Sequence, residues 1–411
     1  MFDLVDVLKK GEKKAPEEKS DISSVLFYQT DQCRSMVKEA YKFEGYVPPT
    51  LSENTDDLIS DHVRGANVEI IIVELNQSQN VTQDAERISH LLPNDASVVI
   101  VGSEDAISTI RNLKKLGFYY LFWPVNKEEM IDFVKSVWDN RRRANGIGKR
   151  RKAKRISIIG SKGGIGTTMI TAEVSLLLTA EKHASCIVVD NHYQGGNLDI
   201  MLGIEKFEKM EVRPGSLASS LDNTSAQSLL KKRNSMLSVL ALTSNDLSAQ
   251  DLKEYTKSVM DNVSEDANFV IEDFSANAAL NFSYSEIVDV SDCLVIAFTP
   301  TVASLREAAR MKKRFTEINE KDSLRMILLL NHVQPEAMAT VTVAEAEQYL
   351  ESPIDIKLPY IKKLDSRLLE NKRVVTLRGA PGREIRKLAS LILGEDGNVK
   401  KKGLSFSFGK G

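Results

Sequence analysis

The chain has 411 residues, of which 42% are hydrophobic and 27% charged, and its formal net charge at pH 7 is −2. This composition is that of a globular protein with about two domains, and it excludes a disordered or collagen-like chain. A pI near 6.3 excludes electrostatic attraction of the whole chain to nucleic acid, so nucleic acid is not an expected partner.

The sequence carries no feature of a secreted or membrane-spanning protein. Residues 1–22 become charged after Leu8 and lack the long apolar run of a signal peptide. The three cysteines, Cys33, Cys186 and Cys293, have neither disulfide-framework nor metal-site spacing. We therefore expect a cytoplasmic chain whose residues 1–22 form a flexible segment, with a short docking helix as the alternative for the first ten residues.

Residues 23–143 alternate apolar strand patterns with amphipathic helix patterns. Residues 44–67 are less regular and must add one strand and one helix. Such alternation predicts an α/β domain with a parallel sheet covered on both faces. The strands are expected at 23–29, 68–75, 96–102 and 118–125, and the helices at 32–43, 81–92, 104–117 and 127–143.

A basic segment separates this domain from a second one. The stretch "RRRANGIGKRRKAKR" holds nine basic residues in fifteen. We interpret residues 144–155 as a solvated linker, with a membrane- or polyanion-binding patch as the alternative. The strand–helix pattern resumes over residues 156–394, and the Gly- and Lys-rich residues 395–411 are expected to be a flexible tail.

The second domain opens with a glycine-rich turn between a strand and a helix, "GSKGGIGTT". Glycines allow backbone N–H groups to turn toward phosphates, and a helix N-terminus attracts the same anions. In the strict phosphate-binding motif a lysine precedes the Mg²⁺-binding Ser or Thr. Here Thr168 stands at the Mg²⁺ position, but Thr167 replaces the lysine.

The early lysine of this turn, Lys162, makes it similar to the deviant phosphate loop of the MinD/ParA ATPases. In that family the early lysine reaches the nucleotide of the partner subunit. With its second lysine missing, the loop more closely resembles that of the TadZ/CpaE pilus-assembly proteins. The resemblance implies a P-loop NTPase domain of the MinD/ParA (SIMIBI) type, with a mostly parallel sheet, that binds ATP and Mg²⁺ as a homodimer.

The segment "DNHYQGGNLDIMLG" resembles the second switch segment of the same family. Asp190 ends a strand beside the loop, where it would order Mg²⁺-bound water or the loop itself. His192 stands where the family usually places the aspartate that polarises the attacking water. We therefore assign no catalytic residue. Asp199 is expected to shape the switch or the dimer surface.

Two further segments extend the resemblance. "ANFVIEDFSA" is similar to a Walker B strand that ends in Asp273, and Glu272 is expected to be a solvated or capping carboxylate on the other face. By the resemblance, Asn331 hydrogen-bonds adenine, whereas Ile361 replaces a family aspartate. The implied metal ligands, direct or through water, are Thr168, Asp190 and Asp273. The implied nucleotide-binding residues are Lys162, Gly163, Gly164, Ile165, Gly166, Thr167, Thr168, Asp190, Asp273 and Asn331.

Residues 23–143 resemble a response-regulator receiver, a flavodoxin-like domain, as in TadZ/CpaE proteins. The positions that carry phosphorylation chemistry have changed: Glu74 replaces the phosphoacceptor aspartate and Trp123 replaces the lysine before proline. Ser103 is compatible with the usual Ser/Thr. We interpret the receiver site as degenerate, with Glu74 as a permanent mimic of phosphoaspartate being the weaker alternative.

These resemblances imply an ATP-binding localisation factor of the Tad/Flp (type IV) pilus machinery, a nucleotide-linked dimeric scaffold whose hydrolysis is very slow or absent. Its expected partners are a second copy, the secretion ATPase and inner-membrane components, with recruitment to the inner membrane at a cell pole. The alternative is an active ParA/MinD-type ATPase that positions DNA or protein cargo. A transcriptional response regulator is disfavoured, because no helix-turn-helix pattern follows the receiver.

Overall fold

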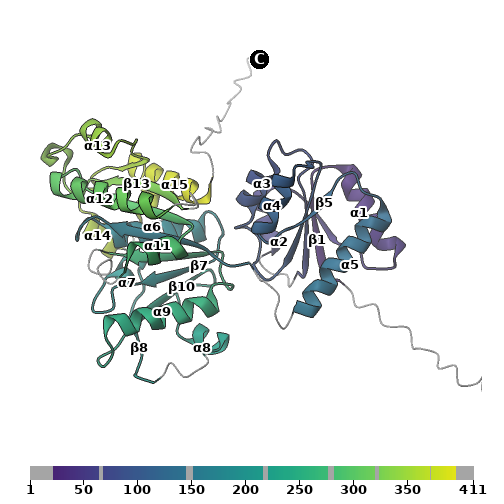
Figure 1. The fold of residues 1–411 in the computed structure, drawn as a ribbon, viewed down its shortest axis with the longest axis horizontal. Helices are drawn as coiled ribbons and strands as arrows, with labels where there is room; N and C mark the ends of the chain where they lie inside the picture. Colours follow the sequence, from purple (N-terminus) through teal and green to yellow (C-terminus); the bar gives the residue numbers. More distant parts are fainter. Residues whose placement is uncertain are drawn as a thin grey trace, which may run out of the picture. The chain divides into compact units, whose positions relative to one another are not determined.

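The computed structural model describes residues 22–63, 68–144, 151–215, 221–275, 282–319, 324–370 and 372–394. The predicted N-terminal segment 1–22 (apart from Ile22), the centre of the linker and the tail 395–411 lie outside these residues. The described residues form two compact units, one built around each sheet. The two units are coloured along the sequence in Figure 1.

The first unit holds a five-stranded parallel sheet with the order β2-β1-β3-β4-β5. Helices α1 and α5 lie on one face of it, and α2, α3 and α4 on the other (Figure 1). Its elements are β1 (Ser24–Tyr28), α1 (Asp31–Phe43), β2 (Thr50–Glu53), α2 (Asp56–Val63), β3 (Ile70–Glu74), α3 (Val81–Ile88), β4 (Ser97–Gly102), α4 (Ile107–Lys115), β5 (Tyr119–Phe122) and α5 (Lys127–Ala144).

The strand and helix expected within residues 44–67 are present as β2 and α2. All residues of β3 are buried, because helices cover both faces of a parallel sheet. The predicted α/β class with a parallel, flavodoxin-like sheet is therefore confirmed for this unit.

The second unit holds a nine-stranded sheet with the order β14-β13-β12-β6-β11-β7-β10-β8, in which only β9 pairs antiparallel, with β10. Its strands are β6 (Lys154–Gly160), β7 (Cys186–Asp190), β8 (Met210–Glu211), β9 (Lys231–Lys232), β10 (Leu237–Thr243), β11 (Phe269–Phe274), β12 (Cys293–Phe298), β13 (Arg325–Asn331) and β14 (Ile356–Leu358). The helices are α6 (Thr167–Ala180), α7 (Leu198–Leu202), α8 (Asn223–Ser228), α9 (Ala249–Val263), α11 (Tyr284–Val290), α12 (Val302–Ile318), η2 (Glu336–Met338), α13 (Val343–Leu350), α14 (Leu364–Leu369), η3 (Val374–Thr376) and α15 (Ala380–Leu393).

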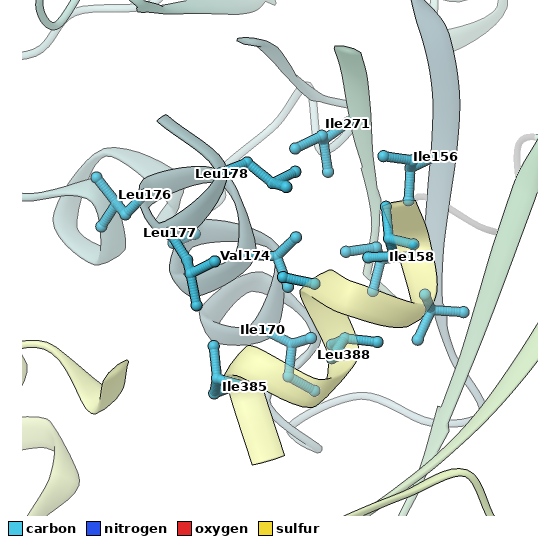
Figure 2. Close-up of a cluster of buried hydrophobic side chains, with 14 of the residues drawn as sticks. Ile156, Ile158, Ile170, Val174, Leu176, Leu177, Leu178, Ile271, Ile385 and Leu388 are labelled. Carbon is cyan, nitrogen blue, oxygen red and sulfur yellow. The ribbon is translucent and has the colours of Figure 1, made fainter. Parts of the chain in front are cut away.

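The central helix α6 is buried on almost every side. Figure 2 shows Ile170, Val174 and Leu178 of α6 between the strands β6 and β11 and the helix α15 (Ile385, Leu388). Three hydroxyls of α6 donate to carbonyls one turn earlier in the same helix: Thr171 to Thr167 at 3.1 Å, Ser175 to Thr171 at 2.6 Å and Thr179 to Ser175 at 3.0 Å. The helix thus satisfies these polar groups internally and remains compatible with an apolar environment.

Strand β6 lies near the middle of the second sheet, between β12 and β11. The chain leaves its carboxyl end, forms the turn of residues 161–166 and enters α6. In open parallel sheets ligands bind at the carboxyl ends of the strands, where the strand order reverses direction. The fold therefore places the glycine-rich turn where a nucleotide site is expected.

One prediction about this sheet is wrong. Glu272 faces away from Asp273, as the strand period requires, but it is only 4% exposed. Helices cover that face as well, so the carboxylate is not solvated, and it forms an ion pair with Arg155 at 3.0 Å. The strand β6 also begins at Lys154, so the last two basic residues of the predicted linker belong to the sheet.

Candidate functional site

The glycine-rich turn exposes its backbone. Gly164 and Gly166 have φ angles of 74° and 87°, in the left-handed region where a side chain is strained. A Cβ added at Gly164 would meet no heavy atom within 4 Å, so a ligand can approach the backbone closely there. Gly163 is exposed as well, whereas Ile165 points into the core.

Thr167 begins α6 and fills the space beneath the turn. It is 4% exposed, and a Cβ built on Gly160 would lie 2.4 Å from its Oγ1. The hydroxyl thus occupies the base of the loop, and its short side chain adds no positive charge there. Thr168, the next residue, is half-buried at the helix N-terminus. Lys162 is exposed, which leaves its ammonium accessible from outside the subunit.

Two carboxylates meet at the neighbouring strand ends. Asp190 of β7 pairs in register with Asp273 of β11, and they are 3% and 1% exposed. Burial raises the pKa of Asp273 to about 7; a hydrogen bond from Thr168 lowers it, the charge of Asp190 raises it, and Lys209 lowers it. Within the described part of the chain, Asp273 Oδ1 is buried with no hydrogen-bond partner.

These residues fit a hydrated Mg²⁺ ion and the phosphates of a nucleotide. Two acidic oxygens and a hydroxyl are ligands that Mg²⁺ prefers, and the unpartnered Asp273 Oδ1 requires a cation or a donor. The exposed backbone of Gly163 and Gly164 and the N-terminus of α6 favour an anion beside them.

A lysine that the sequence analysis did not identify also lies at this site. Lys209 Nζ forms an ion pair with Asp190 Oδ2 at 2.8 Å and donates to the backbone carbonyl of His192. Its side chain is 17% exposed, and it borders a cavity of about 340 Å³. Lys209 precedes a two-residue strand in a segment without helical or strand periodicity, so no local pattern identifies it.

His192 is held by its backbone. Its N–H donates to Asp190 Oδ1 at 2.9 Å, and its ring lies beside Gly195, where an added Cβ would be 3.6 Å from the ring carbon Cε1. Asp199, at the start of α7, is half-buried and lines the same cavity as Lys209. The histidine is therefore close to the carboxylate site.

Asn331 ends β13 and contacts the loop. Its side-chain amide donates to the Ile165 carbonyl at 2.7 Å, and a Cβ on Gly166 would lie 2.7 Å from its Nδ2. Asn331 thus stabilises the glycine-rich turn through this hydrogen bond. Contact with an adenine ring stays a prediction, and it would involve a side chain whose nitrogen already bonds the protein.

The receiver-like unit has its own cluster at the carboxyl ends of its strands. Glu74 is fully buried, and its carboxylate accepts hydrogen bonds from Gln29 N (2.6 Å), Thr30 N (2.8 Å), Thr30 Oγ1 (2.6 Å) and Asn76 Nδ2 (2.8 Å). Thr30 in turn caps α1 by accepting from Cys33 N at 3.2 Å. The carboxylate at the predicted phosphoacceptor position therefore holds the β1–α1 turn together.

The other two predicted receiver positions, Ser103 and Trp123, follow β4 and β5. Ser103 is exposed just after β4. Trp123 is half-buried, its side chain packs against the apolar core of its unit, and its backbone N–H donates to the Gly102 carbonyl at 2.8 Å. An indole in this place supplies no ammonium for a phosphoryl group.

No known family model matches the chain. It is 24% identical over 211 residues to the putative septum site-determining protein MinD of Emiliania huxleyi, covering 48% of this chain and 71% of that protein. It is also 24% identical over 246 residues to an uncharacterised ATP-binding protein of Methanocaldococcus jannaschii, covering 58% of this chain and 88% of that protein. A ParA family ATPase structure from Chlorobium tepidum TLS is similar with 19% identity and a TM-score of 0.47, covering 57% of this chain and 98% of that one.

About half of the chain is thus homologous to MinD. This similarity confirms the MinD part of the predicted resemblance. The assignment to the TadZ/CpaE proteins and the receiver identity of the first unit stay predictions.

Proposed function

We propose that this protein binds ATP with Mg²⁺ as a nucleotide-linked switch that hydrolyses ATP very slowly or not at all. The observation that carries this proposal is the combination at the end of β6: an exposed glycine turn beside two buried carboxylates, with threonine where the loop lysine belongs. The similarity to an ATP-binding relative supports the choice of ligand.

Slow turnover follows from the residues that are missing. Phosphoryl transfer depends on charge stabilisation and positioning, so the loss of one transition-state contact costs orders of magnitude in rate. Thr167 supplies no charge, and His192 stands in place of a water-polarising aspartate. Thr168, Asp190 and Asp273 would hold Mg²⁺, and the bound ion would supply positive charge to the phosphates.

In the cell we assign this switch to the Tad/Flp pilus machinery as a homodimeric localisation factor. The support is the resemblance of both halves to TadZ/CpaE proteins, together with a receiver-like unit whose phosphoacceptor position holds an internally bonded glutamate. Such a unit would act by binding partner proteins through its surface and not by being phosphorylated. Its partners would be the secretion ATPase and inner-membrane components at a cell pole, reached from the cytoplasm by peripheral membrane association. Within the described residues, no helix is long and apolar enough to cross a membrane.

Two measurements test the proposal. Calorimetric titration should show ATP binding in the presence of Mg²⁺, and steady-state turnover should stay far below the enzyme median of about 10 per second. Absence of binding at millimolar ATP would exclude the switch, and turnover near that median would favour the active cargo-positioning ATPase.

The pilus assignment has a separate test. Deletion of the gene should abolish surface pilin while plasmid and chromosome segregation continue normally, and a fluorescent fusion should gather at one pole. Normal piliation with lost segregation would assign the protein to DNA partition instead.

A further inference from the structure

The nucleotide site proposed above lacks the charge of a loop lysine, but another lysine lies close to it. Lys209 reaches Asp190 with a Nζ–Oδ2 distance of 2.8 Å and also bonds the His192 carbonyl. Asp190 is the register partner of Asp273, so the ammonium stands at the same strand ends as the carboxylates of the site.

The surroundings of Lys209 differ from those of a surface ion pair. Exposed pairs contribute little, because water screens them and both side chains must be ordered. Here the side chains of Lys209 and Asp190 are 17% and 3% exposed, so the charges interact with little screening. The lysine also lines a solvent-open cavity of about 340 Å³, together with Gly196 and Asp199.

A lysine ammonium has three donors, and two of them serve Asp190 and His192. The ammonium can therefore donate a third hydrogen bond, to an anionic oxygen. An ammonium beside Asp190 stands where a hydrated Mg²⁺ would also interact, and it supplies a positive charge to a phosphate even without the metal.

We propose that Lys209 is a phosphate-binding residue of the nucleotide site. Although it lies in another segment of the chain, it supplies the positive charge that the loop lacks at position 167. This inference rests on the proposed function and specifies the ligand: a nucleoside triphosphate that binds with a reduced requirement for Mg²⁺. The competing interpretation is a purely structural pair that neutralises Asp190.

The test compares the affinity for a fluorescent ATP analogue in Mg²⁺ and in EDTA. Loss of one charge-assisted contact to phosphate weakens binding about tenfold to hundredfold. Lys209→Met should show a loss of that size, larger in EDTA than in Mg²⁺, while Lys209→Arg retains most of the affinity. The matched control is Lys232→Met, which removes an exposed lysine of β9 in the same sheet and should bind like the parent.

A compensating variant separates phosphate binding from structure. Thr167→Lys restores the loop cation, so the double variant Thr167→Lys/Lys209→Met should recover the affinity that Lys209→Met loses. A structural ion pair is not replaced by a lysine in the loop, so the melting temperature should not recover with the affinity. If Lys209→Met does not fold, Asp190→Asn/Lys209→Met removes both charges of the pair and should show the same loss in EDTA.

The outcomes are distinct. If the parent binds no ATP analogue even with Mg²⁺, the proposed function fails and this inference with it. If the parent binds and Lys209→Met binds equally well in EDTA, or binds more tightly in Mg²⁺, Lys209 is a structural or competing cation and the inference alone is wrong.

Discussion

At the scale of single residues, the burial of Asp273 affects the stability of the protein without ligand. Burial raises its pKa from 3.8 to about 7. Between those values the unfolded chain releases its proton while the folded protein keeps it, so the free energy of unfolding falls as the pH rises. Above pH 7 the full penalty applies, and below pH 4 it is absent.

Replacing this carboxylate should therefore stabilise the protein when no ligand is present. In EDTA without nucleotide, we expect Asp273→Asn to raise the free energy of unfolding at pH 8 by roughly 2–4 kcal/mol, with little change at pH 4. Urea unfolding at both pH values measures the effect, and Asp261→Asn on the exposed face of α9 is the control. A gain that does not depend on pH would contradict the assignment to a buried, protonatable Asp273.

Glu74 illustrates the opposite case, a buried carboxylate that accepts hydrogen bonds from backbone and side-chain donors. Four hydrogen bonds converge on it, so Glu74→Ala leaves buried donors without an acceptor and should destabilise the protein by about 2–4 kcal/mol. Glu53→Ala, an exposed carboxylate at the end of β2, should change stability by less than about 0.5 kcal/mol. Thermal unfolding of the three proteins gives the comparison.

The same residue should remain chemically silent toward phosphodonors. We expect acetyl phosphate to leave the mass of the parent and of Glu74→Asp unchanged, because the shorter acid still lacks an ammonium at position 123. A stoichiometric phosphate adduct in intact-mass analysis would show that the receiver site retains its chemistry.

At the scale of elements, the proposed function places the phosphates of the nucleotide at the turn between β6 and α6. Thr167→Lys places an ammonium where the loop has only a hydroxyl, and a charge-assisted contact should tighten ATP binding about tenfold to hundredfold. Turnover should rise only when His192→Asp is added, because the water-polarising group is a separate deficiency. Single-turnover assays on both single variants and the double variant separate the two contributions. Fast hydrolysis by Thr167→Lys alone would show that His192 already serves as the base.

The elements themselves were largely predictable, because hydrophobic periodicity is a local property of the sequence. The strand β3 reads as an unbroken apolar run, and the turn glycines stand next to one another. The site was predictable only where its residues lie in such motifs. Lys209 meets Asp190 through the tertiary fold, and Glu272 is buried because helices cover the far face of the sheet. Neither the ion pair nor the burial can be predicted from the residues that neighbour Lys209 or Glu272 in the sequence.

At the scale of the whole molecule, the proposed homodimer has two candidate interfaces. Lys162 is exposed in the loop, and the receiver-like unit exposes Ile107, Ile110 and Phe122 from α4 and β5. If the nucleotide is shared across the dimer, Lys162→Ala should weaken ATP-dependent dimerisation about tenfold or more and leave folding intact.

Sedimentation with and without ATP distinguishes the two surfaces. Phe122→Ala tests the surface of the first unit. Phe122 is chosen over its neighbour Trp123 because Phe122 is 47% exposed, whereas Trp123 packs into the core. If Phe122→Ala becomes monomeric while Lys162→Ala dimerises like the parent, the shared-nucleotide dimer is wrong.

The enclosure of α6 has a consequence for how the protein attracts an anion. A helix in water has its dipole field weakened by solvent along its whole length, whereas α6 is surrounded by aliphatic side chains, and several of its hydroxyls bond its own carbonyls. Its field is therefore insulated and acts mainly at the amino end, at the glycine turn. Part of the pull on a phosphate thus comes from the backbone, which mobile ions screen poorly and which no side-chain substitution removes.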